Sequence, residues 1–114
     1  MTNLIRAVLP PFVFFVTYNV AAQTAKSWNP SISPSGIIFY DGPLASWRGN
    51  ALLGGLSSKA LIRLALDHDR VIGEERIDMN RRIRDIIQSS DGTILLLSDG
   101  TGGELLRLSP TDSK

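Results

Sequence analysis

The sequence predicts an all-β fold, and three observations carry this prediction. Beyond residue 23, no segment of ten or more residues has the apolar stripe of a helix. Short apolar runs are instead bounded by turn-forming residues. Three Asp-Gly pairs stand between these runs, and Asp-Gly tolerates the positive φ that tight hairpin turns require. Neighbouring strands are therefore expected to be antiparallel.

The apolar runs predict seven strands in chain order. They span residues 36–40, 50–56, 61–66, 71–77, 83–88, 93–98 and 105–108. The Asp-Gly pairs lie at 41–42, 91–92 and 99–100. The run Ile94-Leu95-Leu96-Leu97 is apolar on both faces, which favours sheets stacked on one another over a single sheet with one wet face.

A weak internal repeat groups these strands into two units. Leu61-Ile62-Arg63-Leu64 recurs as Leu105-Leu106-Arg107-Leu108, 44 positions later, and an apolar pair with an Asp-Gly turn precedes each copy. A period in the forties with about four strands is typical of β-propeller blades. We therefore expect a blade over residues 36–79, an incomplete last blade over 80–109 that lacks its fourth strand, and a tail over 110–114.

Residues 1–22 differ from the rest and predict a secretory signal peptide. Arg6 precedes an uninterrupted apolar run from Ala7 to Val16, and Val20-Ala21-Ala22 offers the small residues of a cleavage site. The run is too short to span a bilayer, which takes about 20 residues. A buried strand from Phe12 to Tyr18 and an interfacial anchor are the alternatives.

Composition excludes several classes of protein. The 114 residues contain no cysteine, which rules out disulfides and thiol chemistry. The sequence has twelve basic and eleven acidic residues, so its net charge is +1. This charge gives no electrostatic signature of nucleic-acid binding. The single histidine, His68, lies between two aspartates in a predicted turn, where a general base would be poorly held. No metal-binding or nucleophile motif is present.

The densest polar cluster is Asn80 to Asp85, at the start of the second unit. On an extended strand Arg82 and Arg84 share a face while Ile83 points away. Two guanidinium groups on one face favour an anion between them, and carboxylates or phosphates fit such a pair. The alternative is a solvated turn whose arginines pair with Asp78, Asp85 and Glu75.

A second candidate is the Pro-containing loop over residues 23–35. Its prolines fix φ and favour a rigid, extended path. Trp28, Asn29 and Ser31 in this loop either line a ligand pocket or belong to a connection in which Trp28 covers the core. Trp47 is expected to pack at a blade corner.

Several stretches in order resemble the C-terminal region of the soluble aldose sugar dehydrogenases, the glucose/sorbosone dehydrogenase family. The resemblance covers residues 27 to 109 and rests on Ser31–Tyr40, Trp47–Asn50, Gly73–Arg76, Arg82–Asp85 and Ser90–Asp99. It implies a six-bladed propeller, of which this chain holds about two blades. It also implies pyrroloquinoline quinone (PQQ) and calcium as cofactors, oxidation of aldose sugars at the anomeric carbon, and export to the periplasm.

The resemblance assigns roles to four residues. Arg82 and Arg84 would contact the tricarboxylate quinone, and Asn29 and Ser31 would border the quinone and sugar. The family's general-base histidine and its calcium ligands match no residue here, and His68 does not correspond to that histidine. We therefore expect no catalytic residue or metal ligand in this chain.

Because the chain lacks these parts of the family's pattern, two functions remain open. In the first, the chain is a truncated sugar dehydrogenase that is inactive alone, either a degenerate gene product or a part whose missing blades come from a second polypeptide. In the second, it is a non-catalytic, exported β-blade module that pairs through its open strand edge with another strand or with a second copy of itself.

Overall fold

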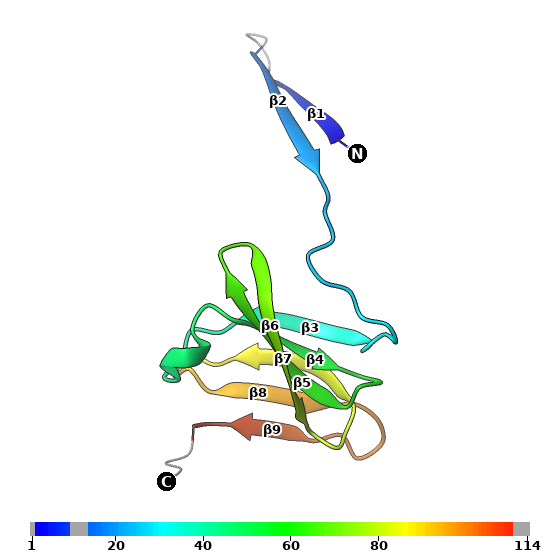
Figure 1. Cartoon of the computed structure of the whole chain (residues 1–114), viewed down its shortest axis with the longest axis vertical. Helices are drawn as coiled ribbons and strands as arrows, with labels where there is room; N and C mark the ends of the chain where they lie inside the picture. The colour runs from blue at the N-terminus through cyan, green and yellow to red at the C-terminus, as the bar shows by residue number, and fades with distance from the viewer. Residues whose placement is uncertain (1, 10–13, 111–114) are drawn as a thin grey trace.

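The computed structural model describes residues 2–9 and 14–110, and almost all regular structure in them is β-strand (Figure 1). The all-β prediction is confirmed. Among the described residues the one exception is a short 3-10 helix, η1 (Ala45–Trp47). The strands are β1 (Thr2–Leu9), β2 (Phe14–Ala21), β3 (Pro34–Phe39), β4 (Ala51–Gly55), β5 (Ala60–Asp67), β6 (Arg70–Asp78), β7 (Ile83–Gln88), β8 (Ile94–Ser98) and β9 (Leu105–Leu108).

The first sheet contains β3, β4, β5 and β6 in that order, and every neighbouring pair is antiparallel. It is the four-stranded unit that the sequence predicts. Its first strand begins at Pro34, two residues before the expected start at Gly36. Proline is tolerated there because it is the first residue of an edge strand, where no ladder hydrogen bond is lost.

The second sheet contains β7, β8 and β9, also antiparallel, and is the predicted three-stranded unit. Of the three Asp-Gly pairs, Asp91-Gly92 closes a short hairpin, with Gly92 at φ +87°. Asp41-Gly42 instead opens the longer connection that contains η1, and Gly42 has no positive φ. The tightest reversal in the first sheet lies at His68, which has φ +57°.

The two sheets pack face to face around one hydrophobic core. We call the faces that meet the shared faces, and the faces turned away from them the free faces. The core is formed by Tyr40, Leu52 and Leu61 of the first unit and by Ile83, Ile86, Ile94 and Leu96 of the second. Gly54 permits the close approach, because a Cβ there would lie 2.6 Å from Cγ2 of Ile83.

A second core covers part of the free face of the first sheet. Residues 22–33, which we call the strap, cross this face, and Ile32 of the strap is fully buried on it. Trp28 packs against the same cluster, as the core-covering interpretation of this residue expects. Trp47 packs edge-to-face on Tyr40, with ring centroids 5.8 Å apart, at the corner where η1 meets the first sheet.

Residues 2–9 and 14–21 form the hairpin of β1 and β2, in which Thr2 lies opposite Ala21 and Leu9 opposite Phe14. Among the described strands, these two pair only with each other. Met1 and residues 10–13 of the predicted leader, and residues 111–114 of the predicted tail, lie outside the described residues. The presence of this hairpin does not show whether residues 1–22 are removed by a signal peptidase. The signal peptide therefore stays a prediction. Within the described ranges, no helix has the length and apolarity to cross a membrane.

Replacing Ile86 by alanine should lower the free energy of unfolding by about 3 kcal/mol, because it opens a cavity between the sheets. Ile86 is 3% exposed. The matched control is Ile72→Ala on β6, where the isoleucine is 63% exposed and the expected loss is below about 0.5 kcal/mol. Urea denaturation measures both. Equal losses would contradict the core described here.

Candidate functional site

The innermost strands of the two sheets, β3 and β7, lie side by side and run in the same direction. The hydroxyl of Ser35 on β3 donates to the carbonyl of Ile83 on β7 at 2.7 Å, and the carbonyl of Gly54 shares the same hydrogen at 3.1 Å. At the other end of these strands, the backbone N–H of Asp41 donates to Gln88 Oε1 at 3.1 Å. Both strands therefore begin at the same end of the molecule.

We call this the arginine end. It is formed by the connections that precede or join strands there: residues 29–33, 56–59, 79–82 and 99–104. All four candidate residues lie at it, Asn29 and Ser31 before β3 and Arg82 and Arg84 at the start of β7. The topology thus places at one end two segments that are about fifty residues apart in the sequence.

Arg82 is the residue before β7, and an aspartate holds it. Its Nε donates to Asp99 Oδ2 at 3.2 Å, and its backbone carbonyl accepts the N–H of Asp99 at 2.8 Å. Asp99 lies opposite Arg82 because the next pair of residues, Ile83 on β7 and Ser98 on β8, face each other across the two strands. The two Nη groups of Arg82 make no hydrogen bond to another described residue.

Arg84 lies in a β-bulge, between Ile83 and Asp85. Ile83 is fully buried while Arg82 and Arg84 are exposed, but the bulge interrupts the alternation of faces, so the shared face of the two arginines stays a prediction. Within residues 2–9 and 14–110, Arg84 makes no ion pair. The convergence of the two arginine side chains on one ligand also stays a prediction.

The alternative set of partners for the arginines is not the one observed. Asp78 accepts the backbone N–H of Asn80, and Glu75 accepts Arg63 Nε at 2.9 Å. Asp85 accepts the backbone N–H of Ile86. Arg81 instead faces Glu104 across 3.7 Å.

The loop residues Asn29 and Ser31 are exposed. Ser31 is held locally: its hydroxyl accepts the N–H of Ser33 at 3.0 Å, and its carbonyl accepts the hydroxyl of Ser57 at 3.1 Å. No hydrogen bond between these loop residues and Arg82 or Arg84 occurs in the described part of the chain. The loop residues and the arginines thus share an end of the molecule with no hydrogen bond between them among the described residues.

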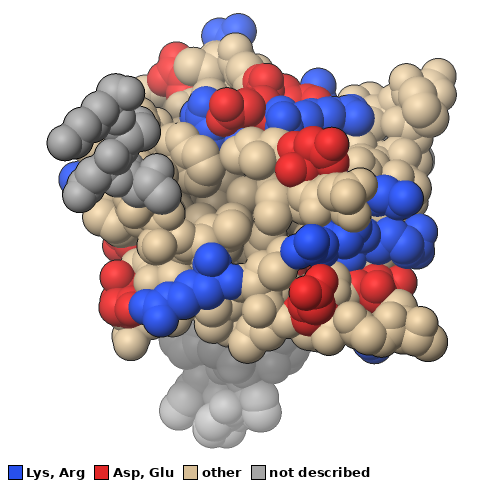
Figure 2. All heavy atoms as spheres, turned by 90° about the horizontal axis from the view of Figure 1, so that it is seen from below, with Lys and Arg blue, Asp and Glu red and all other residues tan. Residues whose placement is uncertain are grey.

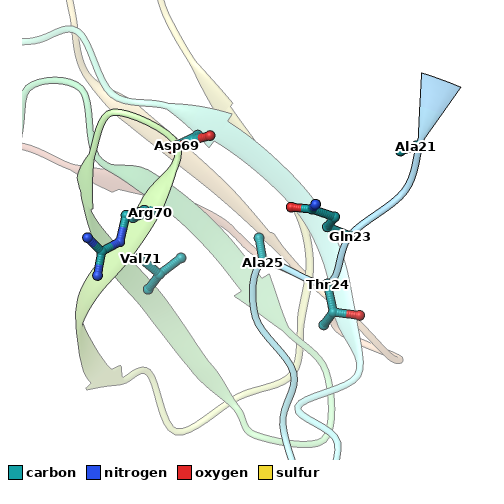
Figure 3. A pocket seen from close by; sticks show the side chains of 7 residues that line it. All are labelled: Ala21, Gln23, Thr24, Ala25, Asp69, Arg70 and Val71. Carbon is teal, nitrogen blue, oxygen red and sulfur yellow. The ribbon is translucent and has the colours of Figure 1, made fainter. Parts of the chain in front are cut away.

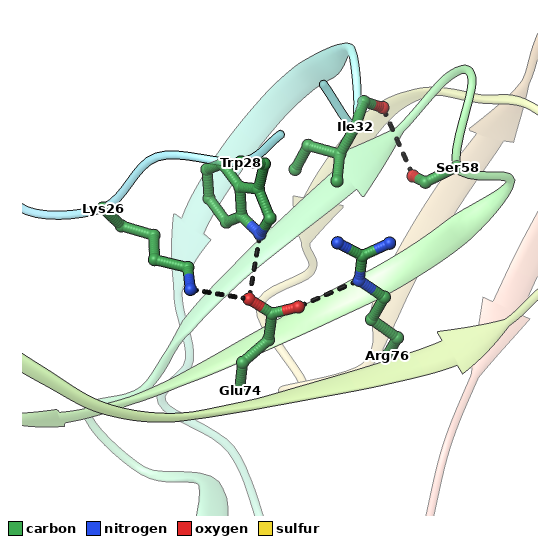
Figure 4. Close-up of polar contacts among 6 residues, drawn as sticks. All are labelled: Lys26, Trp28, Ile32, Ser58, Glu74 and Arg76. Atoms are coloured by element: carbon green, nitrogen blue, oxygen red, sulfur yellow. Dashed lines mark hydrogen bonds and ion pairs between the residues drawn. The ribbon is translucent and has the colours of Figure 1, made fainter. Parts of the chain in front are cut away.

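Glu74 on β6 fixes the strap that leads into this loop (Figure 4). Its carboxylate accepts Arg76 Nε at 2.9 Å and Trp28 Nε1 at 2.9 Å, and it pairs with Lys26 Nζ at 3.2 Å. Farther along the strap, Ser58 donates to the carbonyl of Ile32 at 3.3 Å. These donors, Arg76 first, lower the pKa of Glu74 from 4.5 to about 2.

Other polar features lie away from the arginine end. A cavity of about 520 Å³ is formed by residues 21 and 23–25 and by Asp69, Arg70 and Val71 of the β5–β6 hairpin (Figure 3). His68 lies at that hairpin with its Nδ1 2.9 Å from Asp67 Oδ1. No group of three or more His, Cys, Asp or Glu residues that suits a metal ion occurs within the described ranges. On the side viewed in Figure 2, basic and acidic side chains are interspersed rather than gathered by sign.

Comparison with known proteins identifies the family. The family model for glucose/sorbosone dehydrogenase matches residues 16–107. The chain belongs to the glucose/sorbosone dehydrogenase family. The matched residues begin inside the predicted leader and include the whole arginine end.

Individual relatives resemble the chain over most of its length. The aldose sugar dehydrogenase YliI of Escherichia coli is 35% identical over 91 residues, which are 77% of this chain and 24% of the relative. An uncharacterized protein of Synechocystis, slr1608, is 39% identical over 83 residues, 71% of this chain and 20% of the relative. A solved glucose dehydrogenase superposes with a TM-score of 0.74 at 39% identity, covering 79% of this chain and 29% of that one. The chain therefore spans a fifth to a quarter of the curated relatives, and the resemblance inferred from its motifs is confirmed.

Asp99 restrains Arg82, and Glu74 fixes the strap before Asn29, although neither residue is among the candidates that the sequence predicts. The predicted β7–β8 hairpin contained a signal for Asp99, because a residue just before one strand faces the residue just after its antiparallel partner. For Glu74 no such signal existed, since its partners Lys26 and Trp28 come from an irregular segment.

Glu74→Gln should reduce stability at neutral pH and do so less in acid. A carboxyl with a lowered pKa contributes stability that is present above its unfolded pKa, near 4.5, and lost as pH falls toward 2. Because the side chain is 22% exposed and screened by solvent, we expect a difference of about 1 kcal/mol at pH 7. Urea denaturation at pH 7 and pH 3 measures it, and an equal difference at both pH values would contradict the role of the charge.

Proposed function

We propose that this chain carries part of the PQQ-binding surface of an exported, periplasmic aldose sugar dehydrogenase, and that this surface is the arginine end. Arg82 and Arg84 would hold the carboxylates of the quinone, while Asn29 and Ser31 would border the quinone and the sugar. The single observation that carries the proposal is that family-matching segments before β3 and β7 lie at one end of the paired inner strands.

The donor set at this end fits an anionic group. Arg84 is exposed and makes no ion pair within the described residues. Arg82 is restrained by Asp99 through its Nε, which leaves its two Nη groups for a ligand. Guanidinium groups bind carboxylates through paired, charge-assisted hydrogen bonds, so a polycarboxylate suits these arginines better than a neutral ligand.

The roles of the chain's own residues would be binding and orientation. When bound, the quinone supplies the capacity to accept a hydride from the anomeric carbon of the sugar. The two arginines would fix the carboxylates and balance their negative charge, and Asp99 would keep Arg82 in place. No described residue is assigned to calcium, to proton abstraction or to electron transfer, so we expect quinone binding without sugar oxidation by this chain alone.

The alternative function, a non-catalytic module that pairs through an open strand edge, is favoured by one observation. The four-residue strand β9 pairs with β8 on one side, and it is the edge of the second sheet. This function requires no anion at the arginine end, so binding of the quinone distinguishes the two.

The double variant Arg82→Ala/Arg84→Ala should weaken PQQ binding at least about 100-fold, since each charge-assisted hydrogen bond contributes about 1.5–3 kcal/mol. Isothermal titration calorimetry at low and moderate salt measures the affinity. The matched control is Arg48→Ala/Arg70→Ala, which removes two positive charges at the opposite end of the sheets. Unchanged affinity in the first variant, or equal weakening in both, would refute the assigned role.

A further inference from the structure

The two sheets repeat one pattern of strands, register and irregularity. In the first sheet Ile37 lies opposite Leu53, and Leu53 lies opposite Ile62. In the second sheet Ile86, Leu96 and Leu106 form the corresponding row. The bulge between Pro34 and Gly36 in β3 has its counterpart between Ile83 and Asp85 in β7. The positions of β3 and β4 therefore have equivalents in β7 and β8, and Leu61–Leu64 of β5 have equivalents in Leu105–Leu108 of β9.

Contact between the sheets is made chiefly by the innermost strands. β7 packs against β3 and, to a smaller extent, against β4. Ile86 on β7 belongs to the shared core, and Ile38 on β3 packs against that core. The face of β3 that bears Ile38 thus complements the face of β7 that bears Ile86.

The equivalents of these two residues are exposed on the free faces. Ile87, the equivalent of Ile38, is 52% exposed on the second sheet. Ile37, the equivalent of Ile86, is 54% exposed on the first sheet, and Phe39 beside it is 65% exposed. Leu105, the equivalent of the fully buried Leu61, is 67% exposed. The free face of the second sheet therefore resembles the shared face of the first sheet, and the free face of the first sheet resembles the shared face of the second.

The free face of the first sheet also has room for an incoming side chain. A groove of about 590 Å³ lies between the strap and the sheet, and Ile37, Phe39, Leu53 and Leu64 are among the residues that line it. On the second sheet the corresponding surface is covered by the first sheet of the same chain. The groove is largely apolar, which suits a branched aliphatic side chain such as that of Ile87.

We propose that this chain associates head to tail with further copies of itself. The free face of the second sheet in one copy packs on the free face of the first sheet in the next, with Ile87 against Ile37 and Phe39. Such a heterologous contact repeats from copy to copy until the ring closes. Because propellers close with roughly four to eight blades, two-bladed copies would close as rings of roughly two to four.

Sedimentation velocity of the full chain at about 10–100 µM tests the association. The wild-type chain should form a closed oligomer of defined size, while Ile87→Asp and Ile37→Asp should each be monomeric, with association weakened at least about tenfold. Ile72→Asp is the matched control, because this isoleucine is exposed on the outermost strand β6, and it should associate as the wild type does. Far-ultraviolet circular dichroism checks that each variant keeps its strands.

Mixing the two monomeric variants tests the head-to-tail geometry. Ile87→Asp keeps an intact first-sheet face and Ile37→Asp an intact second-sheet face, so the mixture should form a one-to-one dimer that goes no further. A wild-type chain that stays monomeric would overturn the proposal and leave these faces to a different polypeptide. Oligomers that persist in Ile87→Asp alone, or a mixture that stays monomeric, would overturn it as well.

Discussion

The packing of β3 against β7 joins the two sheets and sets the position of their other strands around the shared core. Ser35 hydrogen-bonds the backbone of Ile83, and Gly54 leaves the space that the Ile83 side chain occupies. A larger residue at position 54 would separate the sheets and expose the core between them. Because this contact makes the inner strands parallel, it also decides which loops meet, and so it brings the 29–33 and 79–82 segments to one end.

The same packing places polar and apolar side chains on different surfaces of the molecule. The arginine end gathers polar side chains where strands begin, whereas the free faces present apolar side chains along the length of the strands. An anion bound at the end and a neighbour stacked on a face would therefore not compete. This arrangement agrees with the greater length of the two curated relatives, of which the matched region is a fifth to a quarter, since stacked sheets extend in one direction while their ends remain accessible.

Much of the fold could be predicted because each strand has a short apolar run and a turn signal beside it. The paired units and the burial of Ile83 between two exposed arginines followed from that pattern. The turn pattern did not predict which Asp-Gly pairs close a tight hairpin. Residues 43–49 follow the first pair, so Asp41-Gly42 begins a long connection instead. The pairing of Arg82 with Asp99 could have been predicted from the ends of the expected strands 83–88 and 93–98. The contacts of Glu74 could not, because they depend on the path of an irregular segment, which neither composition nor periodicity specifies.

The most direct test of the account is nuclear magnetic resonance of the arginine side chains during titration with PQQ. The Nε–Hε signals of Arg82 and Arg84 should shift together and saturate at one equivalent. The Arg82 signal comes from the N–H group that donates to Asp99. Signals of Arg48 and Arg70, at the opposite end, should stay in place. Shifts confined to those two, or spread evenly over all arginines, would contradict the assignment of the quinone to the end where β3 and β7 begin.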